Sequence, residues 1–432
     1  MNHNATVSTH DIPQLVRGIA ERARDAYRAL ALATSEQKRA ALHDAAALLR
    51  RESAQILAAN AKDMELARAK KLTPALLDRL ELTASRVSAM ADGLDGVADL
   101  PDPVGREMEA WDVTHNGLHI KKIAVPLGVI GIIYESRPNV TADAGAICIK
   151  SGNAAILRGG SESLHSSQAI VALLRRALAQ NGLPEDAIQL VPIRDREAVG
   201  AMLTLTDLID VIVPRGGKSL TARIAAESRI PTIQHLDGNC HTYIHKAATL
   251  AMVNRIVLNA KMRRTGVCGA TESLLIDEDI VDAVMPSLIL ALHEAGCTVR
   301  GDKRIMAFSP AITLATEEDW GTEYLDAILS IKVVSGIEEA VAHINHYGSR
   351  HTDAIITADQ AAADMFARKV DSAIVLTNAS TQFADGGEFG FGAEIGISTG
   401  RLHARGPVGA AQLTTYKYVV SGPGQPEGAI RP

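Results

Sequence analysis

The sequence predicts an α/β protein that folds into two α/β domains. From residue 118 onward, short apolar segments alternate with helical stretches of ten or more residues. Such alternation is typical of parallel strands covered by helices on both faces of a sheet. The strand candidates are too many for one comfortable sheet, and 432 residues are more than one hydrophobic core usually serves.

The first hundred residues predict helices without strands. Residues 11–92 are rich in Ala, Leu, Arg and Glu, with the spacing of amphipathic helices. The segment DLPDPVG, residues 99–105, combines Pro with Gly, and we expect it to end the helical region.

The α/β part follows as strand candidates separated by helices. The apolar segments that predict strands are residues 123–134, 154–159, 188–193, 207–214, 231–236, 273–277, 329–334, 353–358 and 372–377. Residues 163–182 and 277–296 predict two of the intervening helices, and Gly182 is expected to close the first of them.

The composition argues against nucleic-acid and membrane partners. The net charge is −6, no run of Lys or Arg indicates a basic groove, and aromatic residues make up only 3%. The N-terminus lacks the apolar stretch of a secretory signal, and the longest apolar run, residues 123–134, is too short to span a bilayer. The four cysteines form no CxxC pair, which indicates free thiols in a reducing cytoplasm.

Two loops that follow strand candidates predict a phosphate-bearing ligand. Residues 154–163 and 211–220 each place paired glycines, a cation and hydroxyl groups just before a helix. In open α/β sheets, ligands bind at the carboxyl ends of strands, where glycines let backbone N–H groups approach phosphates. The alternative is that strand-to-helix turns favour Gly and Ser for structural reasons, but two such loops favour the ligand. The residues concerned are Arg158, Gly159, Gly160, Ser161, Gly216, Gly217 and Lys218.

A third strand end, residues 132–141, leads with polar side chains into an apolar helix. Asn139 follows Pro138 there, and the residues alone favour a helix N-cap. Asn139 could instead direct its amide at a reacting oxygen, as oxyanion donors do.

Cys268 is the candidate nucleophile. The segment KMRRTGVCGATE, residues 261–272, places this cysteine between glycines in a turn that follows a basic helix end. Nearby cations and backbone N–H groups would lower the pKa of an exposed thiol at this position. Burial as a small apolar residue is the commoner fate of a free cysteine, and the turn alone leaves both open. Cys148 and Cys297 have the sequence context of core residues.

The segment HLDGNCHTYIH, residues 235–245, raises the question of a zinc site. It combines Cys240 with three histidines and an aspartate. The segment has the pattern of a strand, whose alternation would distribute these side chains over both faces. We therefore predict no metal.

With these segments in place, the whole chain resembles the aldehyde dehydrogenase superfamily and, within it, the family of γ-glutamyl phosphate reductases. The most distinctive stretches are ESRPNVT, residues 135–141, and HINHYGSRHTDAI, residues 343–355. Others are SGNAAILRGGSES, VPRGGKSL, HLDGNCHTYI, GVCGATE and GRLHARGPVG. The resemblance implies an aldehyde dehydrogenase-like α/β fold with three parts. These are a Rossmann-like cofactor-binding domain (1–106, 123–236 and 388–402), an α/β catalytic domain (237–387) and a small β oligomerisation flap (107–122 and 403–432).

The resemblance also implies an activity. It is the NADPH-dependent reduction of L-glutamyl 5-phosphate to L-glutamate 5-semialdehyde and phosphate, the second step of proline biosynthesis. Cys268 matches the nucleophile that carries the thioester, and Asn139 matches the amide that holds the oxyanion with the Cys268 N–H. Arg158 and Ser161 are placed to hold the 2′-phosphate of NADPH, and Glu323 to hold the nicotinamide ribose.

Two departures from relatives bear on this expectation. Gly269 and Ala270 follow the cysteine where Asn-Ala is frequent, which affects the shape of the pocket. Hydrolytic aldehyde dehydrogenases carry a water-activating Glu that is absent from Leu236-Asp237-Gly238 here. An enzyme that exchanges acyl groups with phosphate must keep its thioester from water, so this absence argues against simple oxidation to an acid.

Further expectations concern substrate and partners. Arg137, Arg401 and Arg405 are candidates for substrate phosphate and carboxylate, and His351 and Asp353 could face the substrate; structural roles are the alternative for each. The resemblance implies a homodimer or an assembly of dimers, and a possible contact with glutamate 5-kinase. The rival functions are a CoA-acylating semialdehyde dehydrogenase of the same superfamily and a nucleotide-binding protein without turnover.

Overall fold

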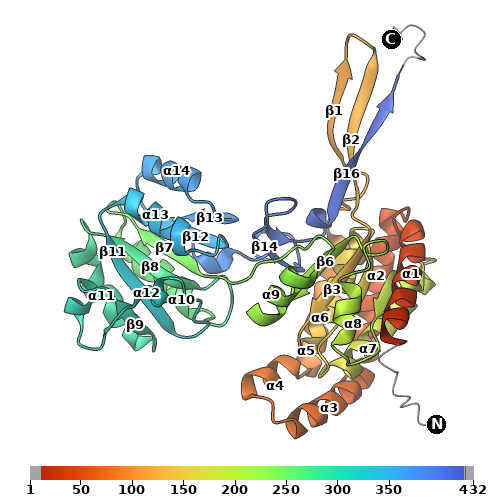
Figure 1. The fold of residues 1–432 in the computed structure, drawn as a ribbon, viewed down its shortest axis with the longest axis horizontal. Helices are drawn as coiled ribbons and strands as arrows, with labels where there is room; N and C mark the ends of the chain where they lie inside the picture. Colours follow the sequence, from red (N-terminus) through yellow and green to blue (C-terminus); the bar gives the residue numbers. More distant parts are fainter. Residues whose placement is uncertain (1–10, 423, 425–432) are drawn as a thin grey trace. The chain divides into compact units, whose positions relative to one another are not determined.

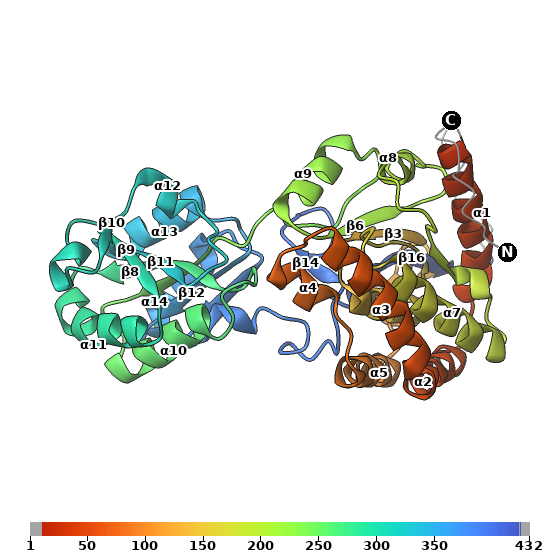
Figure 2. The same cartoon turned by 90° about the horizontal axis from the view of Figure 1, so that it is seen from below.

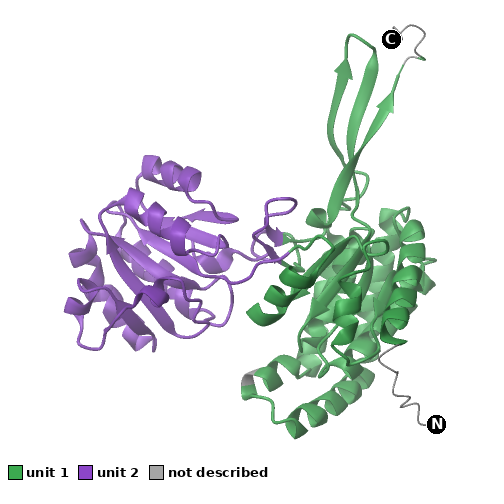
Figure 3. Ribbon diagram, in the orientation of Figure 1, with its two compact units in different colours: residues 1–233, 391–396, 408–432 green, residues 234–390, 397–407 purple. Residues whose placement is uncertain are grey.

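The computed structural model describes residues 11–422 and residue 424, and expectations for residues 1–10, 423 and 425–432 lie outside this described part. The chain divides into two compact units (Figure 3). Unit 1 comprises residues 1–233, 391–396 and 408–432, and unit 2 comprises residues 234–390 and 397–407. Each unit contains a parallel sheet with helices, which confirms the predicted α/β class.

Unit 1 opens with the predicted helices. They are α1 (Ile12–Leu30), α2 (Ser35–Arg51), α3 (Ser53–Ala69), α4 (Pro74–Leu80) and α5 (Ala84–Asp99). Threonine side chains mark several N-termini, because Thr34, Thr73 and Thr83 each accept a hydrogen bond from a backbone N–H of the first turn. Helix α5 ends just before Pro101, as the Pro/Gly segment predicted.

The four-stranded sheet of unit 1 has the order β5-β4-β3-β6, and each pair is parallel. Its strands are β3 (Val129–Tyr134), β4 (Ala154–Arg158), β5 (Ile188–Leu190) and β6 (Val211–Arg215). The connecting helices are α6 (Pro138–Lys150), α7 (Leu164–Gln180), α8 (Glu197–Met202) and α9 (Lys218–Glu227). Figure 2 shows α8 and α9 on one side of this sheet and α7, with α2, α3 and α5, on the other.

Strands β1 (Glu107–Val113), β2 (Leu118–Pro126) and β16 (Thr414–Ser421) form an antiparallel sheet in the order β1-β2-β16. We call this sheet the flap. Its strands lie mostly within residues 107–122 and 403–432, the predicted flap, but β2 continues to Pro126. The flap extends away from the helices of unit 1 (Figure 1). The flap belongs to unit 1 rather than forming a third unit, and the predicted domain boundaries and roles stay predictions.

Unit 2 contains a seven-stranded parallel sheet in the order β10-β9-β11-β8-β7-β12-β13. Its strands are β7 (Cys240–Ile244), β8 (Thr271–Asp277), β9 (Thr298–Gly301), β10 (Thr313–Leu314), β11 (Ile328–Val334), β12 (Thr352–Ile356) and β13 (Ile374–Thr377). Its helices are α10 (Leu250–Met262), α11 (Val281–Glu294), α12 (Glu317–Trp320), α13 (Ile337–Tyr347) and α14 (Gln360–Lys369). The short elements of the chain are β14 (Gly396–Ser398), β15 (Gly406–Val408) and the 3-10 turns η2 (Glu185–Ala187), η3 (Ile305–Phe308), η4 (Thr381–Phe383) and η5 (Ala411–Leu413).

Three strand predictions need correction. Residues 231–236 form only an isolated bridge through Thr232, and the strand that follows is β7. Residues 123–134 split into β2 and β3, because Gly128 has a φ of +134° and turns the chain between them. Strand β6 begins at Val211, so residues 207–210 lie outside it. None of the described helices combines the length and the apolar character that a membrane span requires.

Candidate active site

Cys268 lies in the turn between α10 and β8 and is half-buried. The other three cysteines are buried free thiols. Burial raises the pKa of Cys148 to about 12 and that of Cys297 to about 11, so neither is a thiolate at neutral pH. Cys268 is therefore the one described cysteine that is open to solvent as a nucleophile must be.

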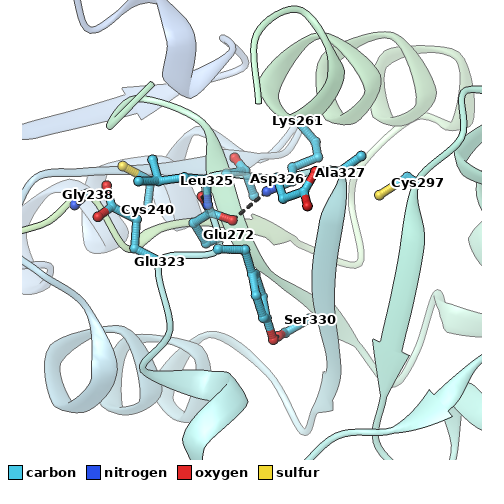
Figure 4. A network of polar contacts seen from close by, with 12 residues as sticks. Gly238, Cys240, Lys261, Glu272, Cys297, Glu323, Leu325, Asp326, Ala327 and Ser330 are labelled. Carbon is cyan, nitrogen blue, oxygen red and sulfur yellow. Dashed lines mark hydrogen bonds and ion pairs between the residues drawn. The ribbon is translucent and has the colours of Figure 1, made fainter. Parts of the chain in front are cut away.

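Gly238 lies directly against the backbone of Cys268. A Cβ built on Gly238 would lie 2.6 Å from the Cys268 Cα and closer still to its carbonyl oxygen. The Gly238 N–H donates to Glu323 Oε1 at 2.8 Å, which places the Glu323 carboxylate beside this contact (Figure 4). Only glycine fits at position 238 without moving Cys268. The hydrogen bond to Glu323 holds the segment that contains Gly238 in place.

The side chains of His235 and His351 lie close to the Cys268 thiol. The side-chain ligand atoms of His235, Cys268 and His351 all lie within 4.8 Å of one another. The rings of the two histidines meet edge to face with centroids 4.9 Å apart. The structure thus brings the fully buried His351 beside the Cys268 thiol, and its predicted role toward the substrate stays a prediction. Sequence reasoning missed His235, which it considered only as part of the rejected zinc segment.

A buried ion pair holds the ends of the Cys268 turn. Lys261, near the end of α10, pairs with Glu272 in β8, and both side chains are fully buried (Figure 4). The Leu325 N–H donates to Glu272 Oε1 at 3.2 Å. Burial raises the pKa of the Glu272 carboxyl, and the Lys261 ammonium opposes that rise. Because Lys261 precedes the turn and Glu272 follows it, the pair ties together the two elements that position Cys268.

Both carboxylate oxygens of Asp353 accept hydrogen bonds from neighbouring residues of unit 2. It is buried in β12, where its Oδ1 accepts a hydrogen bond from the His241 N–H at 2.8 Å. Its Oδ2 accepts a hydrogen bond from Ser372. These contacts order the neighbouring strands, which is the alternative that the sequence left open.

The glycine loops of unit 1 meet at one edge of its sheet. A Cβ on Gly160 would lie 2.8 Å from Ser136 Oγ, and one on Gly216 would lie 2.8 Å from the Glu135 side chain. The loops after β3, β4 and β6 therefore pack against one another, since the carboxyl ends of these parallel strands lie at the same edge of the sheet. Gly217 is the N-cap of α9, whose exposed first residue is Lys218. Backbone N–H groups and a cation at a helix start suit a phosphate group.

Arg158 and Ser161 are engaged in the loop itself. The Arg158 guanidinium is largely buried and donates to the carbonyl oxygens of Gly159, Arg194 and Asp195 at 3.0–3.2 Å. Ser161 Oγ donates to Glu162 Oε1 at 2.6 Å. A carboxylate thus lies beside the hydroxyl that was predicted to hold a 2′-phosphate, and that assignment stays a prediction.

Asn139 is not a helix cap. The N-cap of α6 is Arg137, Pro138 follows it, and the exposed Asn139 is the second helical residue. Its Nδ2 donates to Asp143 Oδ2 at 3.2 Å. Burial raises the pKa of the Asp143 carboxyl to about 6. The interpretation that the residues alone favoured was wrong, because Pro138 rather than Asn139 begins the helix.

Arg137 and Asn139 line a cavity of about 400 Å³ within unit 1. Its other charged residues are Asp78, Arg79, Glu81, Arg86 and Asp143. The candidate cations near the C-terminus have a different setting, since Arg401 and Arg405 both pair with Asp371 in unit 2. Each of those two arginines thus has the structural role that the sequence offered as the alternative.

Comparison with known proteins decides the family. The model of the aldehyde dehydrogenase family matches residues 5–313. The γ-glutamyl phosphate reductase of Rhodospirillum rubrum is 60% identical over 425 residues, which cover 98% of this chain and 99% of the relative. The crystal structure of γ-glutamyl phosphate reductase from Thermotoga maritima matches with a TM-score of 0.93 at 41% identity, over 96% of this chain and 100% of that one. The chain belongs to the aldehyde dehydrogenase family, among the γ-glutamyl phosphate reductases.

More distant relatives show the fold. An acetylating aldehyde dehydrogenase from Geobacillus thermoglucosidasius is 18% identical and matches with a TM-score of 0.69, over 97% of this chain and 99% of that one. In this member of the reductase family, sequence reasoning missed His235 and the close contact of Gly238. The glycine in HLDGNC was the available signal, because a glycine inside a strand-like segment indicates a close backbone approach.

Proposed function

We propose that this chain reduces L-glutamyl 5-phosphate to L-glutamate 5-semialdehyde with NADPH, through a thioester on Cys268. One observation carries the proposal. The chain is 60% identical to a γ-glutamyl phosphate reductase over nearly its whole length. In it, the backbone of the half-buried Cys268 lies against Gly238, and its sulfur lies within 4.8 Å of a ring nitrogen of His235 and of His351. The resulting step belongs to proline biosynthesis.

The Cys268 thiolate attacks the acyl carbon of the acyl phosphate, and a C–S bond forms as the carbon–oxygen bond to phosphate breaks. Phosphate leaves with the electron pair. A bound nicotinamide cofactor would supply hydride for the thioester carbonyl carbon. The Asn139 amide and the Cys268 N–H are the donors that we assign to the resulting oxyanion. The C–S bond then breaks, which releases the aldehyde and restores the thiolate.

The loops of unit 1 support a dinucleotide cofactor. The start of α9 and the loop after β4 would receive the diphosphate and the adenosine ribose, through the residues from Arg158 to Ser161 and from Gly216 to Lys218. We assign the nicotinamide ribose to Glu323. NADPH rather than NADH is the cofactor that we propose.

Arg137 is our candidate for the substrate carboxylate. It lines a cavity of unit 1 together with Arg79 and Arg86, and three carboxylates line the same cavity. His351 is a candidate for the reacting end of the substrate, since its ring lies beside the Cys268 thiol. Arg401, Arg405 and Asp353 are weaker candidates, because their partners already engage them.

We propose that the flap joins two copies of the chain, in a homodimer or an assembly of dimers. Its described surface exposes Trp111, Tyr416, Tyr418, Val419 and Val420. Exposed apolar side chains on strands with open edges favour pairing with another chain. We also propose a contact with glutamate 5-kinase. A cytoplasmic location is a further proposal, supported by four cysteines that form no disulfide.

The deciding experiment measures NADP reduction with glutamate 5-semialdehyde in the presence of phosphate, of CoA, or of neither. We expect strict dependence on phosphate, whereas activity with CoA alone would favour an acylating semialdehyde dehydrogenase. Cys268→Ala should abolish turnover, and the matched control Cys297→Ala should retain it. Full activity of Cys268→Ala would reject the thioester, and absence of turnover with every acceptor would favour a nucleotide-binding protein.

A further inference from the structure

The cluster of Cys268, His235 and His351 has the composition of a zinc-binding site. Zn²⁺ prefers thiolate and imidazole ligands in a tetrahedral arrangement, often with three protein ligands and one open position. Tetrahedral zinc needs ligand atoms roughly 3.3–3.6 Å apart. The three candidate atoms already lie within 4.8 Å of one another, so adjustments of about an ångström would bring them to that spacing.

His351 has a buried ring nitrogen, Nε2, that makes no hydrogen bond with the described residues. The side chain is fully buried in unit 2. Its Nδ1 lies 2.9 Å from Thr352 Oγ1, while its Nε2 has no hydrogen-bond partner among the residues that the structure describes. A buried polar atom without a partner is energetically unfavourable, and a ligand that binds it removes the penalty.

His235 is oriented in the manner of a metal ligand. Its Nδ1 lies 2.8 Å from the carbonyl oxygen of Ile397. A carbonyl only accepts, so in the neutral ring Nδ1 carries the proton and Nε2 carries the lone pair. Metal-binding histidines usually donate their second ring N–H to a carbonyl or carboxylate in this way, which fixes both the tautomer and the ring.

We propose that Cys268, His235 and His351 bind Zn²⁺ and that the bound ion reversibly blocks the enzyme. Binding exchanges the Cys268 thiol proton for a Zn–S bond, with release of one proton and without any change of oxidation state. The sulfur electron pair that would attack the acyl carbon is then engaged by the metal. Only this inhibition depends on the proposed function; the metal site itself does not.

The three ligands, without the neighbouring Cys240, determine which metal ions the site prefers. Cys240 Sγ lies 3.6 Å from His351 Nδ1, but this buried thiol already donates to the Cys268 carbonyl oxygen at 3.1 Å. Cys240 therefore orders the site rather than binding the ion. One thiolate and two imidazoles favour Zn²⁺ and Co²⁺ over Mg²⁺ and Ca²⁺, which prefer oxygen ligands.

Co²⁺ titration of the metal-free full-length chain tests the site, because a Co²⁺–thiolate bond absorbs in the near ultraviolet. We expect one Co²⁺ per chain with that absorption, and its displacement by Zn²⁺. The absorption should vanish in Cys268→Ser, and the affinity should fall at least about tenfold in His235→Gln and His351→Gln. The matched control is His346→Gln, an exposed histidine outside the cluster, which should bind as the wild type does.

The outcomes separate the two proposals. No thiolate absorption, or affinity unchanged in both cluster histidine variants, would overturn the site. If the buried His351→Gln variant fails to fold, judged by circular dichroism, the half-buried His235 decides the test. Zn²⁺ should also inhibit wild-type turnover, with full recovery on chelation, and binding without inhibition would overturn the regulatory part. A Cys268→Ser variant that kept full activity would reject the thioester but leave the spectroscopic result standing.

Discussion

The backbones of Gly238 and Cys268 are in such close contact that any side chain at position 238 would overlap Cys268. A Cβ on Gly238 would lie 2.6 Å from the Cys268 Cα, below the distance that real Cβ atoms show. The obstacle is backbone rather than a flexible side chain, so the nucleophile itself would have to move. A displacement of about an ångström lowers catalysis on the order of 100-fold.

Gly238→Ala should therefore reduce kcat on the order of 100-fold in a protein that still folds. The control is Gly321→Ala, because a Cβ at Gly321 would meet nothing within 4 Å. Steady-state kinetics and circular dichroism of both variants provide the measurement. Wild-type kcat in Gly238→Ala would show that the nucleophile tolerates displacement.

Removal of Lys261 from the buried pair Lys261–Glu272 should destabilise the fold, because the Glu272 carboxylate stays behind unpaired. Lys261→Met leaves a buried carboxylate without its cation, which should lower the free energy of unfolding by about 3–5 kcal/mol. Because burial raises the folded-state pKa of Glu272, protonation favours the folded state. The loss should therefore be larger at pH 8 than at pH 5.5, since stability from a raised carboxyl pKa falls as pH rises.

Urea unfolding measures this effect, and two further variants interpret it. Lys261→Met combined with Glu272→Gln should recover most of the loss, because the Gln Oε1 still accepts from the Leu325 N–H. Lys246 pairs with Asp279 at the surface, so Lys246→Met should change stability by less than about 0.5 kcal/mol. A double variant less stable than Lys261→Met would contradict this account.

The helices and strands that could be predicted from the sequence are those with a regular pattern of apolar residues. Amphipathic spacing predicted the helices from α1 to α5, and apolar runs predicted most strands of both sheets. The prediction failed at residues 231–236, where apolar residues lie next to a unit boundary and Thr232 pairs only once. It also missed β9, a short strand in which Thr298 and Arg300 interrupt the apolar run.

The site was predicted less completely, because its geometry joins distant segments. The Cys268 turn has a local signature of glycines and cations, so it could be found. The approach of His235 and His351 depends on β7 and β12 lying side by side, which no local pattern records. Likewise, the sequence offered Ser161 as a hydroxyl donor, but its hydrogen bond to Glu162 appears only in the folded loop.

His343 predicts sensitivity to acid. It is buried, and neither of its ring nitrogens has a hydrogen-bond partner among the described residues. Burial, helped by the neighbouring His241, lowers its pKa to about 3. Below an unfolded pKa near 6.5 the unfolded state takes up a proton that the folded state does not, so stability falls as pH falls. Between pH 6.5 and pH 5 this group should remove on the order of 2 kcal/mol.

His343→Phe should abolish that part of the pH dependence while keeping an aromatic ring beside Trp320 and Tyr347. Urea unfolding at pH 7 and pH 5 gives the two free energies, and the wild type should lose more between them than the variant. The exposed His346, changed to Gln, should behave as the wild type. Equal losses in all three proteins would rule out a role for His343.

We expect the Glu162 carboxylate to weaken the binding of NADPH, the cofactor that we propose. Partial burial opposes ionisation of Glu162, but hydrogen bonds from Ser161 and Ser136 hold its pKa below the usual range. The loop that we assign to the adenosine ribose thus contains a carboxylate at neutral pH. That charge would repel the 2′-phosphate of NADPH, whereas NADH has only a hydroxyl at the same position.

Glu162→Gln keeps the shape and the acceptor for Ser161 but removes the charge. If the repulsion amounts to about 1 kcal/mol, the KM for NADPH should fall about fivefold while the KM for NADH changes little. The matched control is Glu185→Gln, an exposed carboxylate of unit 1 in η2. Parallel changes for both cofactors, or a rise in the NADPH value, would instead place the 2′-phosphate away from Ser161, and the arginine-rich turn Arg194–Arg196 would become the next position to test.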